Sequence, residues 1–312
     1  MRHRLVVCSI LLLAACEAGP PSSSPERTSR TVTGTGPIAL APVDAWRRLN
    51  APGAFHTSPL PGPGGSWIAL SGYRGVGLFA VPAAGGRLVT VQDDYLGPRR
   101  FAGAGDRLCL EDAATRQALV ADLGRGELGA ARGAECAGPD YVQDSLGLVL
   151  HAAPGRTLWL HPRRGQLHLE SAAGPPRLLA EAPMWDVRAS TSGRHVAYAT
   201  GVLADPQLHL LDVSTGKVTD LGPGAQPAWL PDGSALVYAV PSGVVPRPGT
   251  TRVESAELFA VEVADLRPRQ LTRTAAIAEM QPAVSSDGRT IFLADWRSGG
   301  IYAVAITREV RP

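Results

Sequence analysis

The sequence is poor in several residue types on which common functions depend. It has one Asn, Asn50, and one Lys, Lys217, beside 29 Arg, a skew that we interpret as the codon bias of a GC-rich genome. Neither sign of charge is in large excess, because the formal net charge is +2. Nucleic-acid binding relies on a basic surface, so the composition gives that class of function no electrostatic support.

Motifs for catalysis and metal binding are also missing. The chain has no Gly-x-Ser-x-Gly, no His-Glu-x-x-His, no Cys-x-x-Cys and no Walker-type phosphate loop. Of the seven scattered His residues, His161 and His168 flank one predicted turn, Pro162-Arg163-Arg164-Gly165. Two imidazoles alone make a poor metal site, so we interpret them as partly exposed strand histidines. The sequence therefore predicts no enzyme, no metal and no cofactor.

The N-terminus has the layout of a secretory signal. Arg2 and Arg4 precede an uncharged apolar stretch from Leu5 to Ala15. This stretch is shorter than the ~20 residues that span a bilayer core, which argues against a permanent transmembrane helix. It ends in Leu13-Ala14-Ala15-Cys16, which resembles the lipobox of bacterial lipoproteins.

That resemblance implies removal of residues 1–15 and attachment of lipid to the thiol of Cys16, while an ordinary signal peptide with a chance Cys is the alternative. Glu17, which is not Asp, implies sorting to the outer membrane. Loss of Arg2 and Arg4 with the signal leaves 28 basic and 28 acidic residues. The mature chain is expected to be neutral and anchored through lipid alone.

Two cysteines remain once Cys8 is cleaved and Cys16 is lipidated. Cys109 and Cys136 would lie in an oxidising compartment, where a disulfide is favoured. Two separate buried thiols are the alternative, and the sequence leaves both open.

The mature chain divides into a tether and one domain. Residues 16–34 are rich in Pro and Ser and have too few apolar side chains to fold, so they predict a flexible tether. From residue 35 to 312 the chain shows short apolar runs broken by Gly, Pro and Asp, which predicts an all-β domain.

An apolar triplet that enters a strand after a turn recurs six times in this domain. The matches are Trp67-Ile68-Ala69, Leu108-Cys109-Leu110, Leu148-Val149-Leu150, Val196-Ala197-Tyr198, Leu236-Val237-Tyr238 and Ile291-Phe292-Leu293. Their steps of 40, 40, 48, 40 and 55 residues are near the length of a four-stranded blade. The sequence therefore predicts a six-bladed β-propeller of four-stranded blades, with insertions near 201–206 and 241–255.

A second set of apolar strands follows the triplets at matching distances. It comprises Leu78-Phe79-Ala80-Val81, Ala118-Leu119-Val120-Ala121, Leu158-Trp159-Leu160, Leu208-His209-Leu210-Leu211, Leu258-Phe259-Ala260-Val261 and Ile301-Tyr302-Ala303-Val304. We expect each triplet and its follower to be the second and third strands of one blade.

The turns before the last triplets carry a family resemblance. Pro227-Ala228-Trp229-Leu230-Pro231-Asp232-Gly233 and Pro282-Ala283-Val284-Ser285-Ser286-Asp287-Gly288-Arg289 resemble the Pro-x-Trp-Ser-Pro-Asp-Gly signature of TolB-type propeller repeats. An Asp-Gly turn offers a side-chain hydrogen bond and a positive φ, so we expect a structural role for Asp232 and Asp287. The fourth repeat has Ser190-Thr191-Ser192-Gly193 instead, and the first three keep only the spacing.

The last blade needs one more strand from elsewhere in the chain. Residues 37–42, Pro37-Ile38-Ala39-Leu40-Ala41-Pro42, are expected to supply it and so to cover an open sheet edge. TolB itself carries an α/β domain before its propeller, and residues 17–50 are too few for one. This departure from the TolB pattern argues against a full TolB-like role.

Binding residues are expected in the loops at the channel mouth, because loops on a rigid scaffold carry function more often than strands. Arg with Tyr or Trp is the composition of interface hot spots. The candidates are Tyr73, Arg74, Asp205, Arg247, Arg252, Trp296 and Arg297. Solvated loop residues without a binding role are the alternative.

The first functional hypothesis is a monomeric, lipid-anchored propeller, on the periplasmic face of the outer membrane, that binds another envelope protein by analogy with TolB-like repeats. The runner-up is an envelope hydrolase or lactonase with a channel site that no motif reveals. Propeller lactonases hold a divalent metal partly through Asn, and the single Asn50 argues against that site. A structural assembly factor of the envelope is a third hypothesis.

Overall fold

The structure, a computed structural model, describes most of the chain beyond residue 36. The described ranges are 37–95, 99–102, 105–112, 115, 117–132, 135–136, 148–153, 156–161, 164–171, 174–247 and 250–308. The expected signal peptide at 1–15, the lipidated Cys16 and the tether at 16–34 lie outside them. Within these ranges no helix has the length and apolarity needed to cross a membrane.

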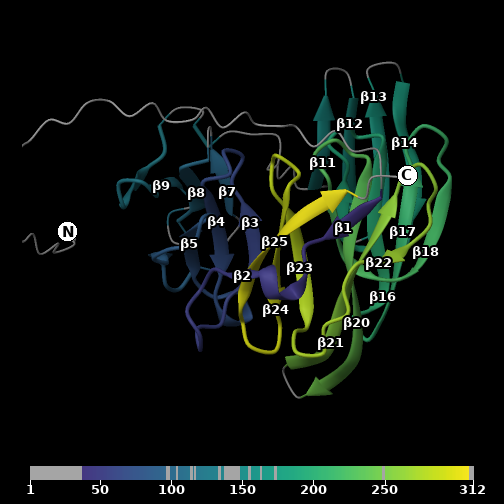
Figure 1. Cartoon of the computed structure of the whole chain (residues 1–312). Coiled ribbons are helices and arrows are strands. Elements are labelled where there is room, and N and C mark those ends of the chain that lie inside the picture. The colour runs from purple at the N-terminus through teal and green to yellow at the C-terminus, as the bar shows by residue number, and fades with distance from the viewer. Residues whose placement is uncertain are drawn as a thin grey trace, which may run out of the picture. The chain divides into compact units, whose positions relative to one another are not determined.

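The described chain is almost entirely antiparallel β-sheet, which confirms the all-β prediction (Figure 1). Sheet 1 contains β3 (Thr57–Pro61), β4 (Trp67–Ser71), β5 (Leu78–Pro82) and β6 (Val89–Gln92). Sheet 2 contains β7 (Arg99–Ala102), β8 (Arg107–Glu111), β9 (Ala118–Asp122) and β10 (Glu127–Ala130). Sheet 3 contains β11 (Leu148–Ala153), β12 (Arg156–His161), β13 (Gln166–Ser171) and β14 (Gly174–Glu181).

The second half of the chain forms three further sheets. Sheet 4 contains β15 (Trp185–Ala189), β16 (His195–Val202), β17 (Asp205–Asp212) and β18 (Val218–Pro223). Sheet 5 contains β19 (Ala225–Trp229), β20 (Ala235–Arg247), β21 (Thr250–Glu262) and β22 (Arg269–Gln270). Sheet 6 contains β23 (Glu279–Val284), β24 (Thr290–Asp295), β25 (Ile301–Arg308), β1 (Ile38–Leu40) and β2 (Arg47–Arg48). Two short 3-10 helices, η1 (Val43–Ala45) and η2 (Tyr73–Gly75), complete the described elements.

The repeat positions differ from expectation in sheet 3. In the other five sheets the two matched apolar segments lie in the second and third strands. In sheet 3, Leu148-Val149-Leu150 belongs to β11, the first strand, and Leu158-Trp159-Leu160 to β12, the second. The alignment of this repeat was therefore wrong by one strand, because neighbouring strands with the same alternation give the same apolar signal.

Neighbouring sheets are joined through side chains that alternate along each strand. On β20, Leu236 and Tyr238 pack with Leu208 of sheet 4, whereas Val237 and Ala239 pack in a cluster shared with sheet 6. Similar clusters join sheets 1 and 2, sheets 3 and 4, and sheets 6 and 1. Both faces of these sheets are thus buried, which is why their second strands read as unbroken apolar triplets.

Sheet 6 combines the two ends of the domain (Figure 1). β1, in the stretch where the sequence predicts a closing strand, pairs with β25 through Ile38 opposite Arg308 and Leu40 opposite Ile306. β2 continues along the same strand through Arg48 opposite Tyr302. The edge of β25 is therefore covered over much of its length.

Asn50 then connects sheet 6 to the start of sheet 1. Its Nδ2 donates to the carbonyl of Gly299 at 2.8 Å, and its Oδ1 accepts the N–H of Ile301 at 2.8 Å. Nδ2 also lies 3.0 Å from Nδ1 of the buried His56, whose pKa is lowered by burial. The single Asn of the chain is thus a structural residue.

The signature turns before the second strands are closed by side-chain hydrogen bonds. Asp232 Oδ1 accepts the N–H of Ser234 at 2.9 Å, and Asp287 Oδ1 accepts the N–H of Arg289 at 3.0 Å. The residue after each Asp is a Gly with a φ of 69°. These Asp side chains form turns, as the sequence predicts.

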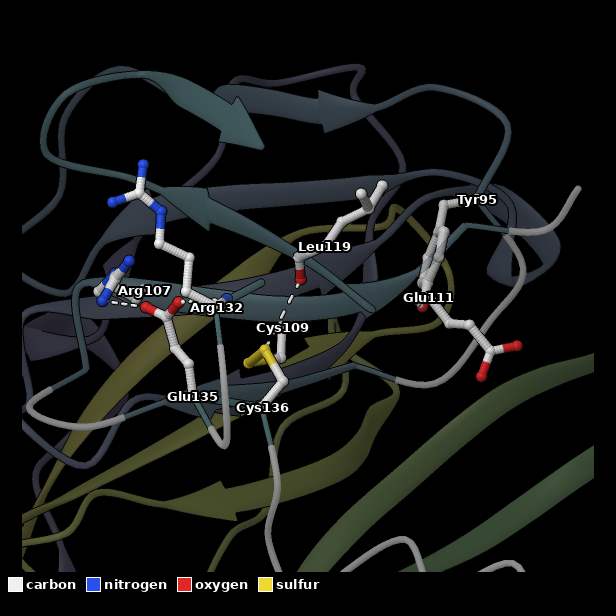
Figure 2. Close-up of a disulfide and its surroundings, with 8 residues drawn as sticks. All are labelled: Tyr95, Arg107, Cys109, Glu111, Leu119, Arg132, Glu135 and Cys136. Atoms are coloured by element: carbon white, nitrogen blue, oxygen red, sulfur yellow. Dashed lines mark hydrogen bonds and ion pairs between the residues drawn. A yellow bond between two sulfur atoms is a disulfide. The ribbon is translucent and has the colours of Figure 1, made fainter. Parts of the chain in front are cut away.

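A disulfide joins Cys109 on β8 to Cys136, beyond the end of β10 (Figure 2). Their Cα atoms are 5.8 Å apart, and the adjacent Glu135 pairs with Arg107. Cys109 and Val120 face away from sheet 1 and pack against Ala131 and Cys136. The disulfide therefore fixes a segment of chain onto the second face of sheet 2.

Candidate functional site

The residues predicted to bind a partner lie at the connections between the second and third strands. Tyr73 and Arg74 belong to η2, between β4 and β5. Asp205 begins β17 opposite Val202, and Trp296 and Arg297 lie between β24 and β25. We call this end of the sheets the b–c end.

The turn of sheet 1 displays an aromatic ring to solvent. Tyr73 is 55% exposed, and its ring makes an edge contact with Phe55 at 5.2 Å between centroids. Arg74 has a φ of 56°, and its guanidinium lies 5.4 Å from the Tyr73 ring. Both predicted residues of this turn are available to a partner.

The turn between β24 and β25 of sheet 6 is stabilised by the buried side chain of Asp295. The buried carboxylate of Asp295 accepts the N–H groups of Ala278 at 2.9 Å and Arg297 at 3.0 Å. Trp296 is half-buried and packs against apolar clusters, and the exposed Arg297 donates to the carbonyl of Ala275 at 3.0 Å. Trp296 is therefore mainly structural, while Arg297 stays at the surface.

Gly299 brings the turns of sheets 6 and 1 together. A Cβ at this position would meet Cα of Phe55 at 2.3 Å, and the φ of Gly299 is 69°. Only glycine allows so close an approach. Phe55 also contacts the Tyr73 ring, so it connects the β24–β25 turn of sheet 6 to η2 of sheet 1.

Sheets 4 and 5 extend at the b–c end as long hairpins. β20 and β21 have 13 residues each, which accounts for the insertion predicted near 241–255. Arg252 is on β21 and pairs with Glu254 at 3.0 Å, while Arg247 ends β20 and its side chain lies outside the described atoms. The tip of the neighbouring hairpin exposes Val202 at 65%.

Exposed apolar side chains concentrate at this end. Eight large apolar residues are exposed in the described part of the chain, and half of them are on these connections, namely Tyr73, Val76, Val202 and Val245. Exposed apolar groups with nearby arginines are typical of protein-binding surfaces. We call these four residues, which lie on separate connections of sheets 1, 4 and 5, the b–c patch.

A second candidate site is a cavity of about 620 Å³ between the first strands of sheets 1, 4, 5 and 6. Its polar lining comprises Ser58, Asp186, Arg188, Gln226 and Gln281. Pro59, Pro61, Pro227, Pro282 and Trp229 contribute apolar walls.

The same backbone distortion recurs in all four strands that line the cavity. Each carries one extra residue relative to its partner strand, a β-bulge. At each bulge one residue is left-handed: Ser58 (φ 51°), Asp186 (φ 48°), Gln226 (φ 55°) and Gln281 (φ 53°). Non-glycine residues avoid this region, so hydrogen bonds must hold these bulges in place.

Those hydrogen bonds pass from sheet to sheet. The carboxylate of Asp186 accepts the N–H of Gln226, and Gln226 Oε1 accepts the N–H of Gln281 at 2.8 Å. Gln281 Oε1 in turn accepts the N–H of Ser58 at 2.6 Å. We call this series the inner chain, in which the side chain of one sheet binds the backbone of the next.

Sequence reasoning missed the inner chain. Its four residues each lie ten positions before the first common apolar residue of their repeat, and Pro follows in three of the four cases. This polar residue before Pro is the signal that could have revealed it. The predicted binding residues were placed in loops, because loops on a rigid scaffold carry function more often than strands.

A buried acid lies near the b–c end. Glu279 is fully buried and accepts the hydroxyls of Thr272 and Thr274, both at 2.5 Å, and the N–H of Leu258 at 3.2 Å. Burial, with a smaller effect of Glu257, raises the pKa of Glu279 to about 7. Glu279 is enclosed on all sides, so it has no access to a substrate.

The histidine pair does not make a site. His168 lies opposite Trp159 and stacks on its ring at 4.3 Å, whereas His161 lies opposite Gln166. Burial and the neighbouring His161 lower the pKa of His168. Among the described residues, no group of three or more His, Cys, Asp or Glu side chains could hold a metal ion.

No protein-family model matches this chain, and no curated protein matches it. Among solved structures, a Bacteroides thetaiotaomicron protein of unknown function is similar, with a TM-score of 0.51 and 8% identity over 87% of this chain and 76% of that one. A putative TolB from Agrobacterium tumefaciens has a TM-score of 0.47 and 11% identity, covering 82% of this chain and 91% of its own. An oligogalacturonate lyase from Vibrio parahaemolyticus has a TM-score of 0.47 and 12% identity, covering 86% and 98%. At such identities these similarities concern the fold alone.

Proposed function

We propose that this protein is a lipid-anchored, six-bladed β-propeller of the bacterial envelope that binds another envelope protein at its b–c end and is not an enzyme. Cys16, behind its signal peptide, would carry the anchor, and the outer membrane facing the periplasm would be its location.

The arrangement of the sheets supports the propeller. Sheets 1 and 6, which are far apart in the sequence, share a cluster that includes Ile68, Leu70, Phe292 and Ile301. A row of sheets would leave its first and last members apart, whereas a ring brings them together. The six sheets would then be the six blades.

The b–c patch is the observation that carries the binding function. Tyr73 and Val202 expose more than half of their surface, although the cores of the sheets bury most apolar side chains completely. Arg74, Arg252 and Arg297 lie at the same end, as expected for an interface with aromatic and arginine anchors.

Site-specific photocrosslinking in living cells tests this function. A photoreactive residue is placed at Tyr73 or Val202, with Val218, an exposed valine on the outermost strand β18, as the matched control. We expect the same protein adduct from positions 73 and 202 and none from 218. Absence of an adduct at 73 and 202, or an equal one at 218, would refute the binding surface.

Two companion variants separate the remaining parts of the proposal. Cys16→Ser should shift the protein from the membrane to the soluble fraction, because one or more acyl chains supply the anchor. Arg74→Glu with Arg297→Glu leaves positions 73 and 202 available to the photoreactive residue and should abolish the adduct without lowering the melting temperature. An envelope-substrate turnover that survives this double variant would favour the hydrolase alternative.

A further inference from the structure

We propose that the cavity between the first strands of sheets 1, 4, 5 and 6 binds a carboxylate group of a ligand with a small apolar body. This site is separate from the b–c patch, and the inference does not depend on the proposed protein partner.

The inner chain fixes the orientation of both glutamine amides. The only atom of a glutamine amide that can accept a backbone N–H is Oε1, so Gln226 and Gln281 must each turn Oε1 toward the next sheet. Each Nε2 then points away from that bond, with two N–H groups to donate. In the described part of the chain neither Nε2 has a protein partner, although both residues line the cavity.

Arg188 adds a cation to these donors. Its guanidinium is exposed in the cavity lining and gives one N–H to the carbonyl of Val187 at 3.0 Å. An arginine has five N–H groups, so most of its donors remain for a ligand. Charge-assisted bonds from arginine to a carboxylate are among the stronger hydrogen bonds in proteins.

Among the side chains that line the cavity, Asp186, Gln226 and Gln281 already use acceptor oxygens within the inner chain. Asp186 is the one acid among the lining residues, and its carboxylate already accepts the N–H of Gln226. Burial raises the pKa of Asp186, and the neighbouring Arg188 opposes that shift. A cavity with surplus N–H groups and a cation best accommodates an anion that accepts several hydrogen bonds.

The apolar walls and the volume of the cavity restrict the kinds of ligand that it can bind. Pro59, Pro227 and Pro282 have no N–H to offer, and with Trp229 they make the rest of the lining apolar. About 620 Å³ is within the ~300–1,000 Å³ of ordinary ligand pockets. Both the C-terminal carboxylate of a peptide and a free short-chain organic acid have this chemistry.

Isothermal titration of the purified domain with three probes tests the inference. The probes are acetyl-Ala-Ala-Leu as the free acid, the same peptide as its C-terminal amide, and hexanoate. We expect saturable binding of the free acid, of hexanoate, or of both, and none of the amide. Binding of the free acid alone indicates a peptide source, and binding of hexanoate alone indicates a small acid.

Two isosteric variants test the geometry. Gln281→Glu keeps the oxygen that accepts the N–H of Ser58 but replaces the donor by an anionic oxygen, so affinity should fall at least about tenfold. Asp186→Asn keeps an oxygen for Gln226 and removes a negative charge, so affinity should rise. Gln117→Glu, at an exposed position just before β9 and outside the cavity, is the control and should leave the affinity unchanged.

Equal binding of acid and amide, absence of binding by all three probes, or unchanged affinity in both cavity variants would overturn the proposal. Melting temperatures near that of the parent protein in all three variants would show that such a result does not come from misfolding. The crosslinks at Tyr73 and Val202 do not involve the cavity. A negative titration result would therefore refute the carboxylate site without refuting the proposed partner surface.

Discussion

At the scale of single residues, Glu279 is the acid whose environment departs most from that of a solvated carboxyl. It is fully buried and surrounded by Thr272, Thr274 and Glu257, with Asp295 opposite it on β24. No cation is among these neighbours. Its burial therefore favours the protonated form, and its pKa is about 7 against an ordinary 4.5.

This difference predicts a pH-dependent stability. The folded state holds the Glu279 proton up to about pH 7, while the unfolded state releases it near 4.5, so stability falls as the pH rises between these values. The loss should approach about 3 kcal/mol above pH 7. Urea unfolding at pH 5 and pH 8 should show this loss in the parent protein and a smaller one in Glu279→Gln.

If the free energy of unfolding fell by the same amount between pH 5 and pH 8 in the parent protein and in Glu279→Gln, the pH dependence would not come from Glu279. A control at Glu254, which is half-exposed and paired with Arg252, should follow the parent profile when changed to Gln. The burial of Glu279 could not be predicted from the sequence, because it depends on two side chains, Thr272 and Thr274, that the 271–278 connection brings against it.

At the scale of elements, the second strands were predictable and the first strands were not. Second strands such as β20 bury both faces, so their apolar triplets are strong signals. First strands such as β19 face the cavity with polar residues and are interrupted by a bulge, which removes the alternation that identifies strands. The misalignment of sheet 3 has a different origin, because its first strand β11 itself begins with the apolar triplet Leu148-Val149-Leu150.

The sequence located the b–c connections but not the contacts within them. Tyr73 and Trp296 are equivalent as aromatic loop residues in the sequence, yet one is exposed and the other packs inside. The difference arises because Trp296 packs against two apolar clusters of sheets 5, 6 and 1, a contact that no local pattern reveals.

The disulfide gives an element-scale prediction for sheet 2. It closes a loop with a sequence separation of 27, for which chain entropy gives about 3 to 4 kcal/mol of stability. Cys109→Ala with Cys136→Ala should lose that amount, and hydrogen exchange should increase first in β8, β9 and β10. Reduction of the parent protein is the control and should have the same effect.

Unchanged exchange in these three strands after removal of both cysteines would show that sheet 2 does not need the crosslink. The sequence left the disulfide open, because the proximity of Cys109 and Cys136 depends on how the segment after β10 returns over β8.

At the scale of the whole domain, β1 joins the start of the domain to its last two sheets. Ile38 is fully buried, its N–H donates to Glu262 at 3.2 Å, and its carbonyl accepts from Arg269 at 2.7 Å. Glu262 and Arg269 belong to sheet 5, while β1 itself pairs with β25 of sheet 6. One short strand therefore stabilises the contact between these sheets.

Ile38→Ala should destabilise the entire domain rather than its N-terminus alone. A buried Ile→Ala change costs about 2 to 5 kcal/mol through lost burial and a residual cavity. Chemical denaturation should show one cooperative transition at a lower midpoint, and Val43→Ala, at a 48% exposed position, should leave the midpoint unchanged. Early, separate release of residues near β1 in Ile38→Ala would contradict a closing role.

The inner chain uses the same kind of hydrogen bond at three junctions, those between sheets 4 and 5, 5 and 6, and 6 and 1. One carboxylate and two amide oxygens perform the same task in turn, and each receiving sheet offers only a backbone N–H, which every residue except proline has. A repeat that carried one such oxygen could therefore be copied beside its parent without new side chains at the boundary. Gene duplication would extend this array while preserving its geometry, and the sequences of the copies would be free to diverge.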